Sequence, residues 1–132
     1  MTGFMADTNI CIYLTTGRYP RLDARVRQVG SNLAISSIVL GELLFGIEKS
    51  ERRGYNREAL GLLLQQFEVF DFGADAAQHY AEIRAYLEKA GTPCGANDML
   101  IGAHARSLGM TLVTNNRREF DRMPGLTVEN WV

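Results

Sequence analysis

The chain has 132 residues, of which 46% are hydrophobic and 22% charged, and its formal net charge is −1. This length suits one domain spanning residues 1–132, and the composition excludes a disordered chain. The near-neutral charge gives no overall polyanion-binding signature. The longest apolar stretch, residues 33–47, is too short and too polar to cross a bilayer. Residues 1–9 show no leader segment, and two cysteines make no disulfide framework, so we expect a reducing, cytoplasmic location without membrane contact.

Short apolar runs alternate with helical patterns along the chain. The runs predict strands at residues 4–6, 33–35, 69–72, 112–113 and 126–128. Apolar residues at helical spacing predict helices over residues 22–29, from about residue 37, over 60–67, over 76–90 and from about 97 to 109. This order predicts an α/β fold in which helices cover both faces of a mainly parallel sheet. Ligands of such sheets bind beyond the carboxyl ends of the strands.

Two acids are expected at that edge from the first half of the chain. Asp7 follows the first strand directly, although an aspartate there also suits the N-cap of the next helix. Glu42 lies in SSIVLGELLFGIEKS, among apolar residues at helical spacing. A carboxylate in that setting is costly to bury unless it is paired, and exposure to solvent or pairing with an arginine are the simpler alternatives.

The second half of the chain adds further polar residues at the same edge. Asp98 opens the helix after GTPCGAN, where an acid also gains favourable helix-dipole energy. Asn115 and Asn116 follow the fourth strand, and Glu119 and Asp121 lie one turn further on. These last two acids are mixed with arginines, as in an ordinary solvated turn.

Carboxylates from separate segments are therefore expected to converge. Such like charges repel and raise one another's pKa, and a hard divalent cation with oxygen ligands resolves the conflict. No cysteine or histidine cluster in the sequence favours a softer metal. The pattern predicts an acidic, Mg²⁺-type site.

Four segments carry a family likeness. MADTNICI, ISSIVLGELLFGIEKS, GTPCGANDMLIGAHA and TNNRREFDRMPGLTVENW resemble, in order and spacing, the PIN-domain toxins of the VapC type. The resemblance covers nearly the whole chain and implies a three-layer α/β/α sandwich. It also implies an Mg²⁺- or Mn²⁺-dependent endoribonuclease that dimerises and is inhibited by a cognate VapB-type antitoxin, with transfer RNA as the first candidate substrate.

The resemblance also assigns roles to individual residues. Asp7, Glu42 and Asp98 become the core acids, with Asp7 and Asp98 as the metal ligands and Glu42 as the group that orients a water or accepts its proton. Many PIN domains have a fourth acid where this chain has Asn116. Glu119 or Asp121 would substitute for it, or Asn116 would orient a water, which leaves the number of metal ions open.

Two other readings of the same residues compete with this one. A phosphatase of the haloacid dehalogenase type needs a second aspartate two residues after Asp7, where this chain has Asn9. A non-catalytic PIN domain that binds metal and RNA or protein is the stronger alternative. Arginines are grouped at residues 18–27, 52–57 and 117–122, and those near the acidic edge are expected to hold RNA phosphates.

Overall fold

The computed structural model describes residues 3–132. Met1 and Thr2, which begin the segment expected to lack a leader, lie outside the described residues. The described elements are, in chain order, β1 (Phe4–Ala6), α1 (Thr8–Thr16), α2 (Pro20–Val29), β2 (Leu33–Ser36), α3 (Ser37–Glu48), α4 (Arg53–Leu64), β3 (Glu68–Phe70), α5 (Ala74–Ala90), α6 (Ala96–Ser107), β4 (Thr111–Val113), α7 (Arg117–Phe120) and β5 (Val128–Glu129).

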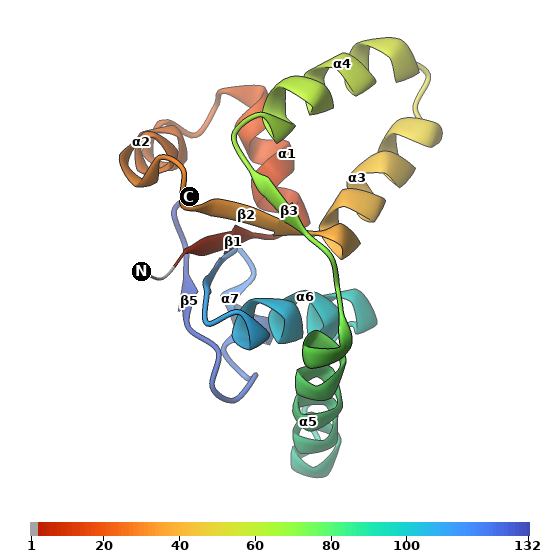
Figure 1. Ribbon diagram of the computed structural model, residues 1–132, viewed down its shortest axis with the longest axis vertical. Helices are drawn as coiled ribbons and strands as arrows, with labels where there is room; N and C mark the ends of the chain where they lie inside the picture. The colour runs from red at the N-terminus through yellow and green to blue at the C-terminus, as the bar shows by residue number, and fades with distance from the viewer. Residues whose placement is uncertain (1–2) are drawn as a thin grey trace.

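The five described strands form one sheet in which every pairing is parallel, in the order β3-β2-β1-β4-β5. The predicted α/β class is confirmed, and helices cover both faces: α1, α2 and α4 lie above the sheet in Figure 1, and α5, α6 and α7 lie below it. The chain builds outward from β1 to β3, then returns to β4 on the other side of β1. The strand order therefore reverses between β1 and β4, where open α/β sheets form a crevice.

The predicted elements differ from the observed ones mainly at their ends. β3 begins one residue earlier and ends two residues earlier than expected, and β5 lies at Val128–Glu129 instead of 126–128. Phe67, expected in a helix, follows the end of α4 at Leu64 and is buried. β3 and β5 lie at the two edges of the sheet, where each strand has only one neighbour to fix the extent of its pairing.

The core lies between the sheet and its two helical layers. Met5, Ile35 and Leu112 of the central strands are completely buried, as are Leu22 of α2 and Ile83 of α5. Because the sheet is covered on both faces, β2 is buried at all four positions, of which the first three are apolar and the last is Ser36. Within residues 3–132 no helix is both long and apolar enough to cross a membrane.

The packing of α6 is unusually close at Gly102. A Cβ atom built there would lie 2.4 Å from the sulfur of Met123, a buried residue of the segment after α7. The absence of a side chain thus lets this segment approach α6 directly. The helix that carries Asp98 is thereby packed closely against the segment after α7.

Candidate active site

The candidate site lies at the carboxyl ends of β1 and β4, where the strand order reverses. The parallel register pairs Ala6 with Val113, so Asp7 and Thr114 are the next residues on the two strands. The backbone N–H of Asp7 donates to the carbonyl of Val113 at 3.1 Å. Both side chains then meet beyond the last pair of the ladder, at the place where ligands of such sheets bind.

Asp7 is buried and has two structural partners. One carboxylate oxygen accepts from the backbone N–H of Ile10 at 3.0 Å, which makes Asp7 the N-cap of α1. The other accepts a short hydrogen bond from the hydroxyl of Thr114, which is fully buried. Burial raises the pKa of Asp7, while these hydrogen bonds oppose the rise. The capping role considered from the sequence is therefore real, and it fixes the carboxylate at the crevice.

Glu42 is half-buried on α3 and takes its partners from two other helices. One oxygen accepts from the Thr8 hydroxyl of α1 at 2.5 Å, and the other accepts from the Asn97 side chain of α6 at 3.1 Å. Glu42 takes part in none of the described ion pairs. The pairing with an arginine that was considered from the sequence therefore does not compensate its burial. The neutral donors Thr8 and Asn97 instead hold the carboxylate at the crevice.

Asp98 and Glu119 form the more open part of the site. Asp98 lies in the first turn of α6 and accepts from the Asn116 side-chain amide at 3.4 Å. Its pKa is raised to about 7, first by burial and then by a hydrogen bond with Glu119 and the charges of Glu119, Asp7 and Glu42. The hydrogen bond with Asp98 lowers the pKa of Glu119, which also accepts from the backbone N–H of Gly95 at 3.4 Å. These opposite shifts favour protonation of Asp98 over protonation of Glu119.

The structure brings Asp7, Glu42, Asp98, Asn116 and Glu119 into one electrostatic neighbourhood, as their mutual hydrogen bonds and pKa effects show. Asp121 is different: it is exposed and its carboxylate pairs with Arg117 at 3.2 Å. Between the two acids considered as substitutes for the missing one, the geometry favours Glu119. Asn116 immediately precedes α7, and its side-chain amide contacts Asp98 directly.

Three residues of the site were not identified from the sequence: Thr8, Asn97 and Thr114. Thr8 and Asn97 directly adjoin core acids, and Thr114 immediately follows β4. Adjacency alone could have made them candidates. Their hydroxyl and amide groups donate to carboxylates, which distinguishes them from the acids that could bind a cation.

The donor set is suited to a hard cation, although it is not a tight ligand cage. The acids of the site and their hydrogen-bond partners present carboxylate, hydroxyl and amide groups, and the pKa of Asp98 is raised first by burial and then by the neighbouring acids. Within the described part of the chain, no three His, Cys, Asp or Glu side chains are already grouped closely enough to hold a metal together. Mg²⁺ needs only one or two protein carboxylates, because water and phosphate oxygens complete its octahedron. Asp7 and Asp98 fit that requirement.

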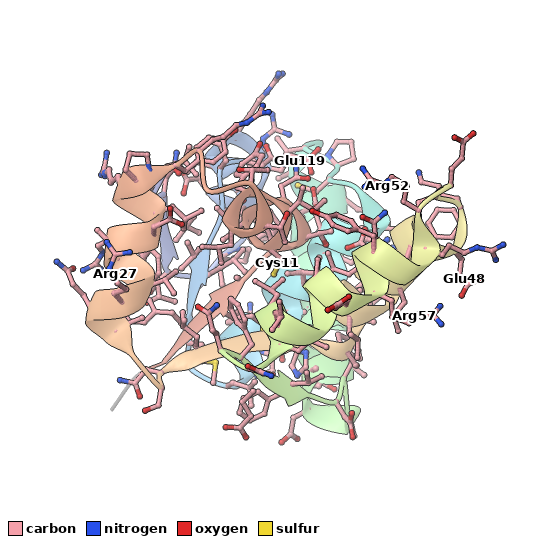
Figure 2. The ribbon with its side chains drawn as sticks, turned by 90° about the horizontal axis from the view of Figure 1, so that it is seen from above. Cys11, Arg27, Glu48, Arg52, Arg57 and Glu119 are labelled. Atoms are coloured by element: carbon pink, nitrogen blue, oxygen red, sulfur yellow. The ribbon has the colours of Figure 1, made fainter. Side chains whose placement is uncertain are left out.

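A cavity of about 400 Å³ lies beside Glu42, next to the arm that α3 and α4 form. Glu42 lies on its wall, and the rest of the lining is mainly apolar, with Cys11, Ile12, Leu43 and Tyr55 among the residues. In Figure 2, Cys11 lies near the centre, between Glu119 and the arm that carries Arg52 and Arg57. A charged group and an apolar surface thus share one opening.

Comparison with known proteins places this geometry in a family. The PIN domain model matches residues 4–126. The chain is 42% identical to Ribonuclease VapC2 of Rickettsia felis, covering 97% of both sequences, and 41% identical to the tRNA(fMet)-specific endonuclease VapC of Salmonella typhimurium, covering 99% of both. The structure of DNA-bound VapBC from Salmonella typhimurium contains a similar chain, with a TM-score of 0.95, 41% identity and full coverage of both chains. The chain therefore belongs to the PIN domain family, in its VapC ribonuclease branch.

Proposed function

We propose that this chain is the endoribonuclease toxin of a VapBC-type toxin–antitoxin pair and that it hydrolyses RNA with the help of Mg²⁺ or Mn²⁺. The observation that carries the proposal is the set of carboxylates around Asp7, at the strand-order reversal of a chain whose full-length relatives are named ribonucleases. Transfer RNA is the first candidate substrate, because relatives about 41% identical are named tRNA(fMet)-specific endonucleases. The chain would act in the cytoplasm as a homodimer.

Asp7 and Asp98 would hold the metal ion. Asp7 is already fixed by Ile10 and Thr114, whereas Asp98 would have to lose the proton that its raised pKa favours. A bound ion would supply positive charge that stabilises negative charge developing on the phosphoryl oxygens. Because Asp98 titrates near neutral pH, metal binding should release a proton over the range in which the enzyme works.

Glu42 would act on the attacking water. Thr8 and Asn97 each donate to one of its oxygens, so both carboxylate oxygens are held in place. The remaining lone pairs can orient a water and accept its proton as the water oxygen attacks phosphorus. The bond from phosphorus to the leaving ribose oxygen would break in the same step, and that oxygen would take a proton from solvent. Asn116 would position Asp98 through its amide, and Glu119 would take up or return the proton of Asp98.

Three groups of arginines differ in their ability to hold RNA phosphates. Arg53 and Arg57 pair with Glu48, and Arg117 pairs with Asp121. Arg18, Arg21 and Arg27 are exposed on or beside α2 and take part in none of the described ion pairs; Arg27 projects outward at the left of Figure 2. Each free guanidinium that contacts a phosphate should steepen the loss of RNA affinity with rising salt.

The partner would be a VapB-type antitoxin, since several similar solved structures are VapBC complexes. An arginine of that partner would pair with the carboxylates, and adjoining apolar side chains would enter the cavity beside Glu42. The product of an adjacent reading frame should co-purify with the untagged chain and abolish cleavage when added in excess. Full activity in the presence of that protein would contradict this assignment.

The deciding experiment is cleavage of total RNA and of initiator tRNA by the purified, antitoxin-free chain. Reactions with Mg²⁺ or Mn²⁺ should give discrete fragments, and reactions with EDTA or with Asp7→Asn should give none. Asp121→Asn is the matched control, because Asp121 pairs with Arg117 outside the acidic cluster. Metal binding without any RNA cleavage would overturn the enzymatic proposal and favour a non-catalytic binding module. The presence of Asn116, where many PIN domains have an acid, is the observation that favours this alternative.

A further inference from the structure

His104 is a buried histidine that no catalytic role accounts for. It lies on α6 with only 2% of its surface exposed, and its Nδ1 is 2.7 Å from the hydroxyl oxygen of Ser36, which is completely buried. The same hydroxyl oxygen accepts from the backbone N–H of Ile38 at 3.1 Å and so caps α3. The Ser36 hydroxyl can therefore donate to Nδ1 in the tautomer whose ring proton is on Nε2.

The Ser36–His104 bond joins the two helices that carry Glu42 and Asp98. These helices meet again at the site itself, where Asn97 of α6 donates to Glu42 of α3 at 3.1 Å. Asn97 and His104 lie two turns apart on one face of α6, roughly 10 Å along its axis. Asn97, near the start of α6, contacts Glu42, whereas His104, further along α6, contacts Ser36 before the start of α3. The two helices therefore run in opposite directions, with one hydrogen bond near each end of their contact.

We infer that His104 is a positioning residue, which acts through Ser36 to hold α3 and α6 in the relative placement that brings Glu42 and Asp98 together. The alternative is that His104 only fills the core, where it also contacts the edge of the Phe72 ring. A filler would be replaced by an apolar side chain with a loss of stability alone. A positioning residue controls geometry at the acids, where a displacement of about 1 Å can cost up to 100-fold in rate.

The chain supplies a matched control in its other histidine. His79 of α5 accepts from the Arg106 guanidinium at 2.7 Å through its own Nδ1, and its described hydrogen bonds include none to the acids of the candidate site. His79→Leu and His104→Leu therefore each remove one imidazole hydrogen bond. His104→Asn restores an acceptor near the position of Nδ1, and Ser36→Ala removes the donor.

The first readout does not depend on activity. The side-chain amide of Asn97 should give an NMR signal whose chemical shift reports its bond to Glu42. The Glu42→Gln variant gives the reference shift for an Asn97 amide whose contact with the carboxylate has been changed. We expect His104→Leu and Ser36→Ala to move this signal toward the reference, with His104→Asn closer to the parent and His79→Leu unchanged. An Asn97 signal that stays at the parent position in both His104→Leu and Ser36→Ala would overturn the inference.

The second readout rests on the proposed ribonuclease function. We expect His104→Leu to lower kcat by about tenfold or more with little change in KM, whereas His79→Leu leaves kcat unchanged even if it lowers Tm by as much. The Ser36→Ala and His104→Leu effects on kcat should be strongly non-additive, since both break the Ser36–His104 bond and only the loss of the α3 cap is specific to Ser36→Ala. Equal losses of kcat in the two histidine variants, or additive effects, would contradict the inference. A parent protein without RNA cleavage would refute the proposed function and leave the NMR test of positioning intact.

Discussion

The two halves of the acidic site differ in how firmly the protein holds them. Asp7 is 6% exposed, and its two oxygens are bound by a helix N-terminus and by the hydroxyl of Thr114. Asp98 is half-buried, is contacted at 3.4 Å by Asn116, and has a pKa raised by burial and by Glu119. The first half is fixed by the N-terminus of α1 and by Thr114, and the second half has a long contact and a pKa raised to about 7. The site thus combines a firmly held carboxylate with a less firmly held one.

The largest expected effect comes from the firmly held half. Asp7→Asn keeps the size of the side chain but removes its charge, so RNA cleavage should fall by at least about 100-fold, as for loss of a principal electrostatic group. Initial rates at saturating Mg²⁺ would measure the change, beside Asp121→Asn. Cleavage by Asp7→Asn at the parent rate would remove Asp7 from the chemistry and break the comparison.

Thr114→Val tests what holds the firmly held half. The substitution preserves shape but removes the donor to Asp7 and the acceptor for the Asn116 backbone N–H. We expect the free energy of unfolding to fall by ~1–3 kcal/mol, the usual cost of leaving buried polar groups without a partner. Urea denaturation would measure it, with the exposed Thr127→Val as a control that should change stability little. Equal losses in the two variants would show that Thr114 does not anchor Asp7.

Asp98→Asn tests the less firmly held half through its pH dependence. Folding raises the pKa of Asp98 to about 7, so the folded protein binds this proton more tightly than the unfolded chain. The stabilisation is complete below the unfolded pKa of about 4 and is lost as pH rises through the folded value. In EDTA, Asp98→Asn should therefore be more stable than the parent at pH 8, and the difference should shrink toward pH 4. A difference that is constant across this range would contradict the raised pKa of Asp98.

Glu119→Gln is expected to have the smallest effect on rate and sharpens the choice of fourth acid. Removing this charge should lower the pKa of Asp98 toward its ordinary value, because Glu119 supplies both a hydrogen bond and a charge that raise it. We expect cleavage to change by about tenfold or less, with a shift of the pH–rate profile to lower pH. A pH–rate profile identical to that of the parent would exclude Glu119 as the substitute for the fourth acid and leave Asn116 as the remaining candidate for that role.

The core acids could be found from the sequence because each is tied to a local signal. Asp7 follows a strand, Asp98 opens a helix, and Glu42 interrupts an apolar stripe. Glu119 was harder to recognise because it is surrounded by arginines and resembles a solvated turn. Its role depends on the placement of α7 against the start of α6, shown by the bond from Gly95, and local pattern carries no information on such a contact.

Sequence by itself determined the fold class, the carboxyl-edge position of Asp7 and the family likeness, because periodicity, strand ends and short motifs are local properties of the chain. Only the tertiary structure decided that Thr114 anchors Asp7, that Asn97 and Thr8 hold Glu42, and that Ser36 meets His104. These contacts join residues far apart in the chain or on separate helices. The physical reason is that hydrogen bonds depend on distances of about 3 Å, which are set by the packing of whole elements and not by the residues next to each donor.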